Sequence, residues 1–153
     1  MVVTTYEGIA KELIWRLKFA GAVAAAQDMA ATVSLVGLSP MAVFVAVPSS
    51  SDRYRQRGYN QAELLMRAWQ KDLPLATMYP LTRVGHQHQL GAGRQQRLHQ
   101  LRTAFRVRSE SVQGAHIILV DDVLTTGATL EAAAAALRQA GAVRIDALVF
   151  AQA

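Results

Sequence analysis

The sequence predicts one α/β domain built on a mostly parallel sheet. Short β-branched apolar runs alternate along the chain with segments of helical periodicity, a pattern typical of parallel strands joined by right-handed helical crossovers. The chain has 153 residues, of which 52% are hydrophobic, and this is enough for one buried core. No internal repeat or linker divides it. We therefore expect residues 1–153 to fold as a single domain.

The composition excludes several classes of chemistry. The chain contains no cysteine, which excludes disulfides, thiolate metal sites and thiol nucleophiles. Its 16 basic and 11 acidic residues give a net charge of +5, which favours polyanionic partners or phosphorylated ligands. No apolar run approaches the roughly 18 residues needed to span a bilayer. The N-terminus lacks the pattern of a secretory signal, so we expect a cytoplasmic protein without membrane contact.

The first 38 residues predict two opening helices. Apolar residues recur with helical spacing over Tyr6 to Phe19. Trp15 falls on an apolar position of this pattern, so we expect it to pack in the core. Ala22 to Val36 predicts a second, more buried helix that ends before a glycine.

The middle of the chain predicts a strand, a loop, a helix and a second strand. Ala42 to Pro48 is a β-branched run between prolines, as expected of a buried parallel strand. Serines and charges predict a loop over Ser49 to Gly58. Asn60 to Leu73 has a helical period, and Leu75 to Leu81 predicts a further strand.

The last seventy residues begin with a polar segment and end with regular elements. Val84 to Leu101 is rich in Gln, His, Gly and Arg and predicts a mobile loop that leads into a short helix. His116 to Val120 predicts a strand, and Leu130 to Ala140 a helix. Arg144 to Ala151 predicts a final strand.

One stretch of the chain carries the chemistry. Residues 117–130 read IILVDDVLTTGATL, in which two adjacent carboxylates end a buried apolar run. Such a pair is unfavourable unless a ligand or cation interacts with it, because carboxylates repel each other and resist burial. The peptide NH groups that follow lead into a helix N-terminus, where a phosphate finds orphan donors and a favourable dipole. The predicted phosphate loop comprises Thr125, Thr126, Gly127, Ala128 and Thr129.

The same stretch narrows the class of ligand. The chain has no GxxxxGK[ST] motif and no GxGxxG after a strand, which excludes the two common nucleotide loops. A phosphate loop preceded by two acids instead indicates a ligand with a phosphate at one end and vicinal hydroxyls beside it. Asp121 and Asp122 would accept hydrogen bonds from a ribose diol. Asp121 is also the candidate ligand for a Mg²⁺ ion that binds a pyrophosphate.

The motif resembles the binding motif for PRPP (phosphoribosyl pyrophosphate) of type I phosphoribosyltransferases. Three further stretches resemble ComF/GntX-like proteins, the competence protein F family. They read YEGIAKELIWRLKFAGA, VAVPSSSDRYRQRGYNQAELL and RVGHQHQLGAGRQQRLHQLRTAF. The resemblance implies a type I phosphoribosyltransferase fold, in which helices flank the sheet and a small hood or lid covers the ligand. Members of that family usually open with a zinc module built from cysteines, and this chain has no cysteine.

The resemblance also assigns roles to other residues. It implies that the segment after Val47 holds the pyrophosphate, and that residues 83–104 form a flexible hood. The implied pyrophosphate residues are Ser49, Ser50, Ser51, Arg53 and Arg57, and the implied hood residues are Arg83 and Gln89. The implied activity is phosphoribosyl transfer with release of pyrophosphate, linked to DNA uptake and competence or to nucleotide metabolism.

The resemblance identifies a donor site but no acceptor site and no catalytic base. The 6-oxopurine salvage enzymes of this fold place an aspartate where this chain has Thr125, and threonine cannot deprotonate a purine near neutral pH. We therefore infer neither hypoxanthine nor guanine as the acceptor. The reaction needs no covalent protein nucleophile.

Two readings from other functional classes stay open at this point. Arg83 to Arg108 contains six arginines and no acid, which is also consistent with a strip for single-stranded DNA. The protein would then be a non-catalytic competence accessory that binds single-stranded DNA or a helicase partner. A nucleotide-sensing regulator is the other alternative. A solvated helix face with pyrophosphate contacts would explain the same arginines.

Overall fold

The structure is a computed structural model, and it describes residues 1–32, 38–73, 75–84, 104–108 and 112–153. Five strands form one sheet in the order β1-β7-β6-β2-β3, and every neighbouring pair is parallel. The elements are β1 (Val2–Thr5), α1 (Gly8–Phe19), α2 (Ala22–Ala31), β2 (Ala42–Ala46), α3 (Ser51–Arg57), α4 (Gln61–Gln70), β3 (Ala76–Met78), β4 (Leu81–Arg83), β5 (Phe105–Val107), β6 (His116–Leu124), α6 (Ala128–Gln139) and β7 (Arg144–Gln152). The predicted α/β class is confirmed.

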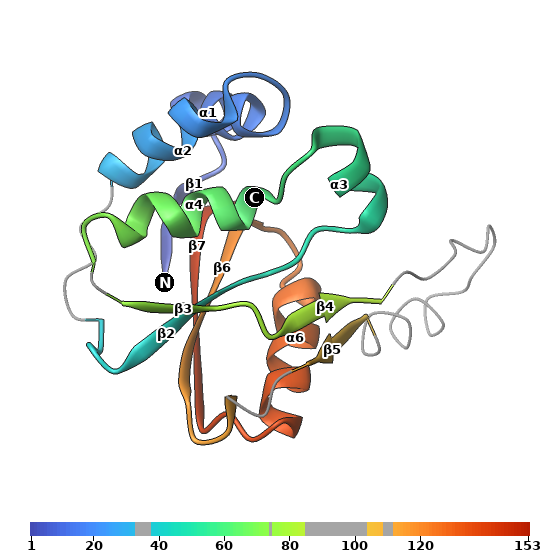
Figure 1. Ribbon diagram of the computed structural model, residues 1–153. Coiled ribbons are helices and arrows are strands. Elements are labelled where there is room, and N and C mark those ends of the chain that lie inside the picture. Colours follow the sequence, from blue (N-terminus) through green and yellow to red (C-terminus); the bar gives the residue numbers. More distant parts are fainter. Residues whose placement is uncertain (33–37, 74, 85–103, 109–111) are drawn as a thin grey trace.

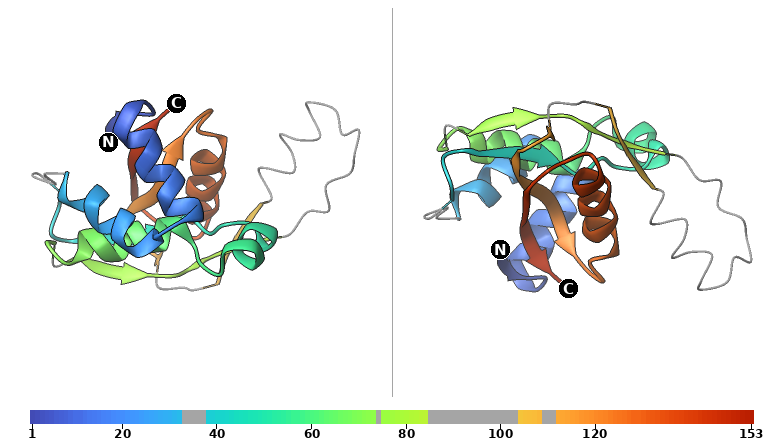
Figure 2. Two further views of the ribbon diagram at one scale, coloured as in Figure 1. Left: turned by 90° about the horizontal axis from the view of Figure 1, so that it is seen from above. Right: turned by 90° about the horizontal axis from the view of Figure 1, so that it is seen from below.

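Helices cover both faces of this sheet (Figure 1). Side chains alternate along β6, so Ile118 and Val120 pack in one apolar cluster with α1, α2 and α4. Ile117 and Leu119 point the other way and pack with α6 and the β4–β5 pair. Both views of Figure 2 show α6 on the opposite side of the sheet from α1, α2 and α4. This double burial explains why the strands read as continuous apolar runs.

The segment after β2 folds as a helix, so the prediction of a loop over Ser49 to Gly58 is wrong. Helix α3 begins after Ser50, whose hydroxyl accepts a hydrogen bond from the Arg53 amide at 3.4 Å. It ends at Gly58, which adopts a left-handed conformation with φ of 79°. The helix buries no residue, so its sequence lacks the apolar period that identified the other helices.

The predicted strand Leu75 to Leu81 is divided into two. Ala76–Met78 pairs with β2 as the edge of the main sheet, whereas β4 lies beyond Pro80 and pairs antiparallel with β5. This separate pair of strands flanks residues 85–103, so the predicted mobile loop, its short helix and Gln89 lie outside the described residues.

The sheet contains one strand that was not predicted, and its central strand is longer than predicted. The chain's first residues form β1, which pairs with β7 and was too short to show a period. Strand β6 continues to Leu124 rather than ending at Val120, so the acidic pair lies within a strand. Helix α2 ends at Ala31, and the remainder of the predicted helix up to Val36 includes residues outside the described part. No helix in the described ranges is both long and apolar enough to cross a membrane.

The two tryptophans occupy opposite environments. Trp69 on α4 is 1% exposed and is among the largest fully buried side chains. Trp15 on α1 is 55% exposed, so the prediction that it packs in the core is wrong. It lies between the buried pair Leu13 and Ile14 and the buried Leu17, so spacing alone made it resemble an inward position.

This contrast gives a prediction for stability. Trp69→Ala should lower the free energy of unfolding by about 3–5 kcal/mol, because it leaves a cavity in the core. Trp15→Ala should change it by less than about 0.5 kcal/mol, because the ring is largely in water. Urea denaturation followed by far-UV circular dichroism measures both. Equal losses for the two variants would contradict the packing described here.

Candidate functional site

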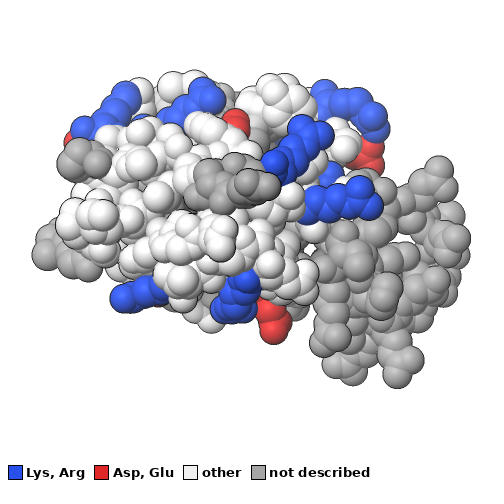
Figure 3. Space-filling view, turned by 60° about the horizontal axis from the view of Figure 1, so that its bottom comes forward, with Lys and Arg blue, Asp and Glu red and all other residues white. Residues whose placement is uncertain are grey.

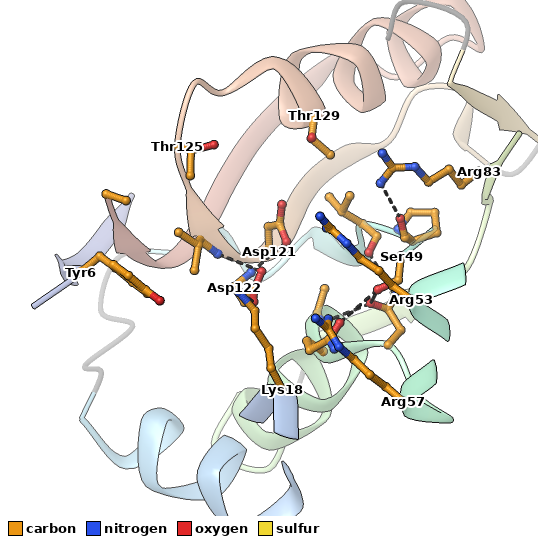
Figure 4. A pocket seen from close by; sticks show the side chains of 17 residues that line it. Tyr6, Lys18, Ser49, Arg53, Arg57, Arg83, Asp121, Asp122, Thr125 and Thr129 are labelled. Atoms are coloured by element: carbon orange, nitrogen blue, oxygen red, sulfur yellow. Dashed lines mark hydrogen bonds and ion pairs between the residues drawn. The ribbon is translucent and has the colours of Figure 1, made fainter. Parts of the chain in front are cut away.

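A cavity of about 420 Å³ lies at the carboxyl ends of the parallel strands (Figure 4). Residues at or just after the ends of β1, β2, β6 and β7 line it, as expected of ligand sites in open α/β sheets. The lining residues are Tyr6, Lys18, Val47, Pro48, Ser49, Arg53, Arg57, Asn60, Gln61, Ala62, Arg83, Asp121, Asp122, Val123, Thr125, Thr129 and Ala153. The fold thus brings the predicted acids, threonines and arginines together.

The two acids are fixed by their own backbone. Asp121 Oδ1 accepts a hydrogen bond from the Asp122 amide at 2.9 Å, and Asp122 Oδ1 accepts one from the Val123 amide at 3.0 Å. The other oxygen of Asp122 lies 3.0 Å from the ammonium of Lys18. Adjacent residues of a strand face opposite ways, so the two carboxylates reach different parts of the cavity.

The electrostatics of the pair favour one proton on Asp121 near neutral pH. Burial and the neighbouring Asp122 carboxylate raise the pKa of Asp121 to about 7, although Lys18 and the Asp122 amide act in the opposite direction. A carboxyl with such a pKa changes its charge in the physiological range. A ligand that supplies donors or a cation at Asp121 would favour its ionised form.

The threonine turn joins β6 to α6 as predicted for a phosphate loop. Gly127 has φ of 75°, a left-handed conformation that residues with side chains rarely adopt, and α6 begins at the next residue. Thr126 Oγ1 accepts a hydrogen bond from the Ala128 amide at 3.4 Å. Thr125 and Thr129 line the main cavity, while the whole loop surrounds a smaller hollow of about 30 Å³. The N-terminus of a 12-residue helix therefore faces the site.

Arginines form the opposite wall of the cavity. Arg53 and Arg57 come from α3, and Arg83 from β4 points toward them in Figure 4. Burial and repulsion by Arg53 lower the pKa of Arg83, and the attraction of Asp121 only partly offsets them. The lining contains four cations and two carboxylates among the described residues, so the cavity favours an anionic ligand.

A buried polar network supports the arginine wall. The side-chain Nδ2 of Asn60 donates to the Val47 carbonyl at 3.0 Å, and Asn60 Oδ1 accepts from Ser49 Oγ at 3.0 Å. Ser49 Oγ also lies 3.1 Å from Gln61 Oε1. At this wall two buried donors, Arg57 Nε and Gln61 Nε2, have no hydrogen-bond partner among the described residues. Unpaired buried donors are unfavourable by about 1–3 kcal/mol each, and ligand oxygens would satisfy them.

Several site residues differ from the sequence-based expectation. Ser50 and Ser51 were expected to hold pyrophosphate, but Ser50 caps α3 and neither residue is among those that line the cavity. The sequence analysis missed Lys18, Asn60 and Gln61 as site residues. Their motifs, RLKFAG and RGYNQA, were visible as part of the resemblance, but nothing in their spacing indicates that they face the same cavity.

The donor set is compatible with Mg²⁺ only if the ligand brings its own oxygens. No group of three or more His, Cys, Asp or Glu side chains gathers in the described residues. Mg²⁺ commonly binds one or two carboxylates together with substrate phosphates, and Asp121, which lines the cavity, is the carboxylate that would hold it.

Comparison with known sequences identifies relatives. The family model described as "Phosphoribosyl transferase domain" matches residues 67–153. Competence protein ComFC of Bacillus subtilis is 36% identical over 143 residues, which are 91% of this chain and 58% of that protein. DNA utilization protein YhgH of Salmonella typhi is 39% identical over 106 residues, or 67% of this chain and 45% of that protein. The chain thus spans about half the length of these relatives.

Comparison with solved structures supports the fold. A structure of the allosteric regulatory enzyme of purine biosynthesis matches with a TM-score of 0.51 and 19% identity, over 81% of this chain and 24% of that chain. At this identity the likeness concerns the fold alone. It agrees with the parallel sheet flanked by helices. Together with the family model, these features show that the chain belongs to the phosphoribosyl transferase domain family and is similar to the ComFC and YhgH proteins.

Proposed function

We propose that the chain binds PRPP with Mg²⁺ and transfers its phosphoribosyl group to an acceptor with release of pyrophosphate. One observation carries this proposal: the phosphate loop, the acid pair and three arginines line one cavity of about 420 Å³. The names of its relatives concern competence and DNA utilization. We accordingly place the activity in DNA uptake or in the handling of nucleotides, in the cytoplasm.

The proposed ligand pose follows from the charges. The 5′-phosphate lies at the N-terminus of α6, where the peptide NH groups and the hydroxyls of Thr125 and Thr129 donate to it. The ribose hydroxyls donate to Asp121 and Asp122. The pyrophosphate lies against Arg53, Arg57 and Arg83, and Ser49 is close enough to add a hydroxyl.

This pose also explains how the residues promote transfer. The bond from the anomeric carbon to the pyrophosphate oxygen breaks while an acceptor nitrogen forms its bond to that carbon, so charge builds up on the leaving group. The arginines stabilise this charge, and the phosphate loop holds the far end of the sugar in register. Bound Mg²⁺ would neutralise part of the pyrophosphate charge, with Asp121 as its protein ligand. The proton that the acceptor nitrogen loses passes to solvent or to another group of the acceptor, because Thr125 cannot act as a base.

The first prediction concerns the acid pair. Asp121→Asn should weaken binding of Mg²⁺–PRPP by at least about tenfold, because it removes the carboxylate that accepts charge-assisted hydrogen bonds from the ribose hydroxyls. Isothermal titration calorimetry measures the affinity. The control is Asp28→Asn, which changes an exposed carboxylate on α2 away from the cavity and should bind as the wild type does. Unchanged affinity in Asp121→Asn would contradict the proposed pose.

The second prediction concerns pH. Asp121 has a pKa of about 7, so it is mostly protonated at pH 6 and mostly ionised at pH 8. Affinity for Mg²⁺–PRPP should therefore rise by about tenfold from pH 6 to pH 8 beyond the change that the ligand's own titration causes. Titrations of Asp121→Asn over the same range supply that background. Equal pH dependence in the variant and the wild type would show that Asp121 does not titrate in the binding step.

A second candidate function rests on a different observation. Trp15 and Phe19 are 55% and 58% exposed on α1, their ring centroids are 5.9 Å apart, and the Arg57 guanidinium lies 5.4 Å from the centre of the Phe19 ring. Exposed aromatic rings beside arginine are typical of surfaces on which the bases of single-stranded DNA stack. The predicted basic strip of residues 83–108 lies largely outside the described residues.

The surface charge of the described residues gives this candidate limited support. On the face seen in Figure 3, Lys and Arg side chains outnumber Asp and Glu side chains, but they are scattered around broad uncharged areas. A continuous basic track is not visible there. The aromatic pair would therefore have to supply much of the affinity, together with Arg57 and residues outside the described ranges.

A third prediction separates this candidate from PRPP binding. If bases stack on α1, the double change Trp15→Ala and Phe19→Ala should weaken binding of a labelled oligothymidylate by about tenfold or more. Fluorescence anisotropy at two salt concentrations measures it. Ile9→Ala, which also removes an exposed apolar side chain from α1, is the matched control. Unaltered oligonucleotide binding in the double variant would exclude α1 as the stacking surface.

A further inference from the structure

Lys18 lines the cavity from outside the region that the family model matches, as do residues of α3 and the start of α4. It lies on α1, well before the matched residues 67–153. Its ammonium is 3.0 Å from Asp122 Oδ2, and the two side chains are only 25% and 16% exposed. Figure 4 shows its side chain extending from α1 toward Asp122. A partly buried ion pair of this kind restricts both partners more than a surface pair does.

The end of α1 is built to hold this lysine in place. The carbonyl of the preceding residue, Leu17, accepts a hydrogen bond from the Tyr59 hydroxyl at 2.9 Å. The ring of the following residue, Phe19, lies under the Arg57 guanidinium at 5.4 Å. Lys18 is also in the last turn of α1, where the helix dipole favours a cation. Three independent features therefore position its ammonium against the acid pair.

The consequence for Asp122 is a fixed carboxylate plane. One of its oxygens accepts from the Val123 amide at 3.0 Å and the other meets Lys18, so rotation of the carboxylate would break one contact or the other. Asp122 Oδ2 is buried beside Lys18 in an ion pair and has no hydrogen-bond partner among the described residues, whereas Oδ1 keeps a second lone pair for a further donor. Asp121 Oδ1 accepts a hydrogen bond from the Asp122 amide and has no ion pair with Lys18. The two acids thus differ: Lys18 orients one of them, and the other faces the arginine side of the cavity.

We infer that Lys18 is a positioning residue that makes the cavity selective for ligands with sugar hydroxyls over plain phosphate anions. By holding the Asp122 carboxylate, it keeps an acceptor aimed at a ribose hydroxyl, whereas the arginines and the phosphate loop serve the phosphates. This inference rests on the proposed binding of a ribose phosphate. It assigns to α1 a role in ligand choice that the phosphoribosyl transferase region alone does not supply.

The test compares two phosphate-bearing ligands, of which only one has sugar hydroxyls. Ribose 5-phosphate and pyrophosphate, each with Mg²⁺, are titrated calorimetrically into the wild type, Lys18→Met, Lys18→Arg and Lys11→Met. Lys18→Met should lower the affinity for ribose 5-phosphate by about tenfold or more and the affinity for pyrophosphate by less than about threefold. Only the Asp122 carboxylate, which accepts from the ribose hydroxyls, loses its orientation. Lys18→Arg should recover most of the ribose 5-phosphate affinity. Lys11→Met, which removes an exposed charge from the same helix, should match the wild type.

Each other outcome overturns the inference in a recognisable way. An equal loss of affinity for both ligands in Lys18→Met would make Lys18 a general electrostatic contact. Unchanged affinity in Lys18→Met, or no recovery of affinity in Lys18→Arg, would contradict its positioning role. A wild type that binds pyrophosphate but not ribose 5-phosphate would refute the inference and leave an anion site, whereas binding of neither would refute the proposed function as well. Thermal unfolding checks that the variants fold, and Lys18→Gln replaces Lys18→Met in the comparison if the latter unfolds.

Discussion

The site depends on the placement of two adjacent carboxylates near the end of a central strand. Burial and the neighbouring Asp122 carboxylate oppose the ionisation of Asp121, and nearby cations act in the opposite direction. Lys18 pairs with Asp122 from one side, and the arginines of α3 and β4 face Asp121 from the other. Strand β6 lies between β2 and β7 and is packed on both faces, and its pairing with β7 continues past the acids and fixes the backbone that carries them. A ligand with hydroxyls, phosphates and a bound cation is suited to this charge pattern.

The rest of the fold can be understood as the support for this arrangement. The parallel strands bring their carboxyl ends to one edge, where Tyr6, Ser49, Thr125 and Ala153 meet although they are far apart in the sequence. The two helical layers serve different ends of the cavity. Helices α1 and α4 contribute Lys18 and the Asn60–Gln61 pair, and α6 presents its N-terminus to the phosphate loop. Substitutions that destabilise the packing of α1 and α4 should therefore affect Lys18, Asn60 and Gln61 most, and those that destabilise α6 should affect residues 125–129 most.

Much of the fold could be predicted from the sequence, and so could the acid pair and threonine turn of the candidate site, for physical reasons. The buried strands show as apolar runs, and the acid pair with its threonine turn is a local motif whose residues stay together in any fold. Helix α3 escaped prediction because it buries nothing, and Trp15 was misplaced because spacing alone does not show which apolar positions meet the core. Lys18 could not be assigned because its partner Asp122 lies more than a hundred residues away. Long-range pairs of this kind leave no trace in local periodicity.

In the proposed complex, phosphate, ribose and pyrophosphate occupy three parts of one cavity. A crystal structure of the protein with PRPP and Mg²⁺ tests this most directly. We predict the 5′-phosphate within hydrogen-bonding distance of the peptide NH groups of residues 125–129, the ribose hydroxyls at Asp121 and Asp122, and the pyrophosphate against Arg53, Arg57 and Arg83. Ligand density elsewhere, or a ribose that contacts neither acid, would contradict it.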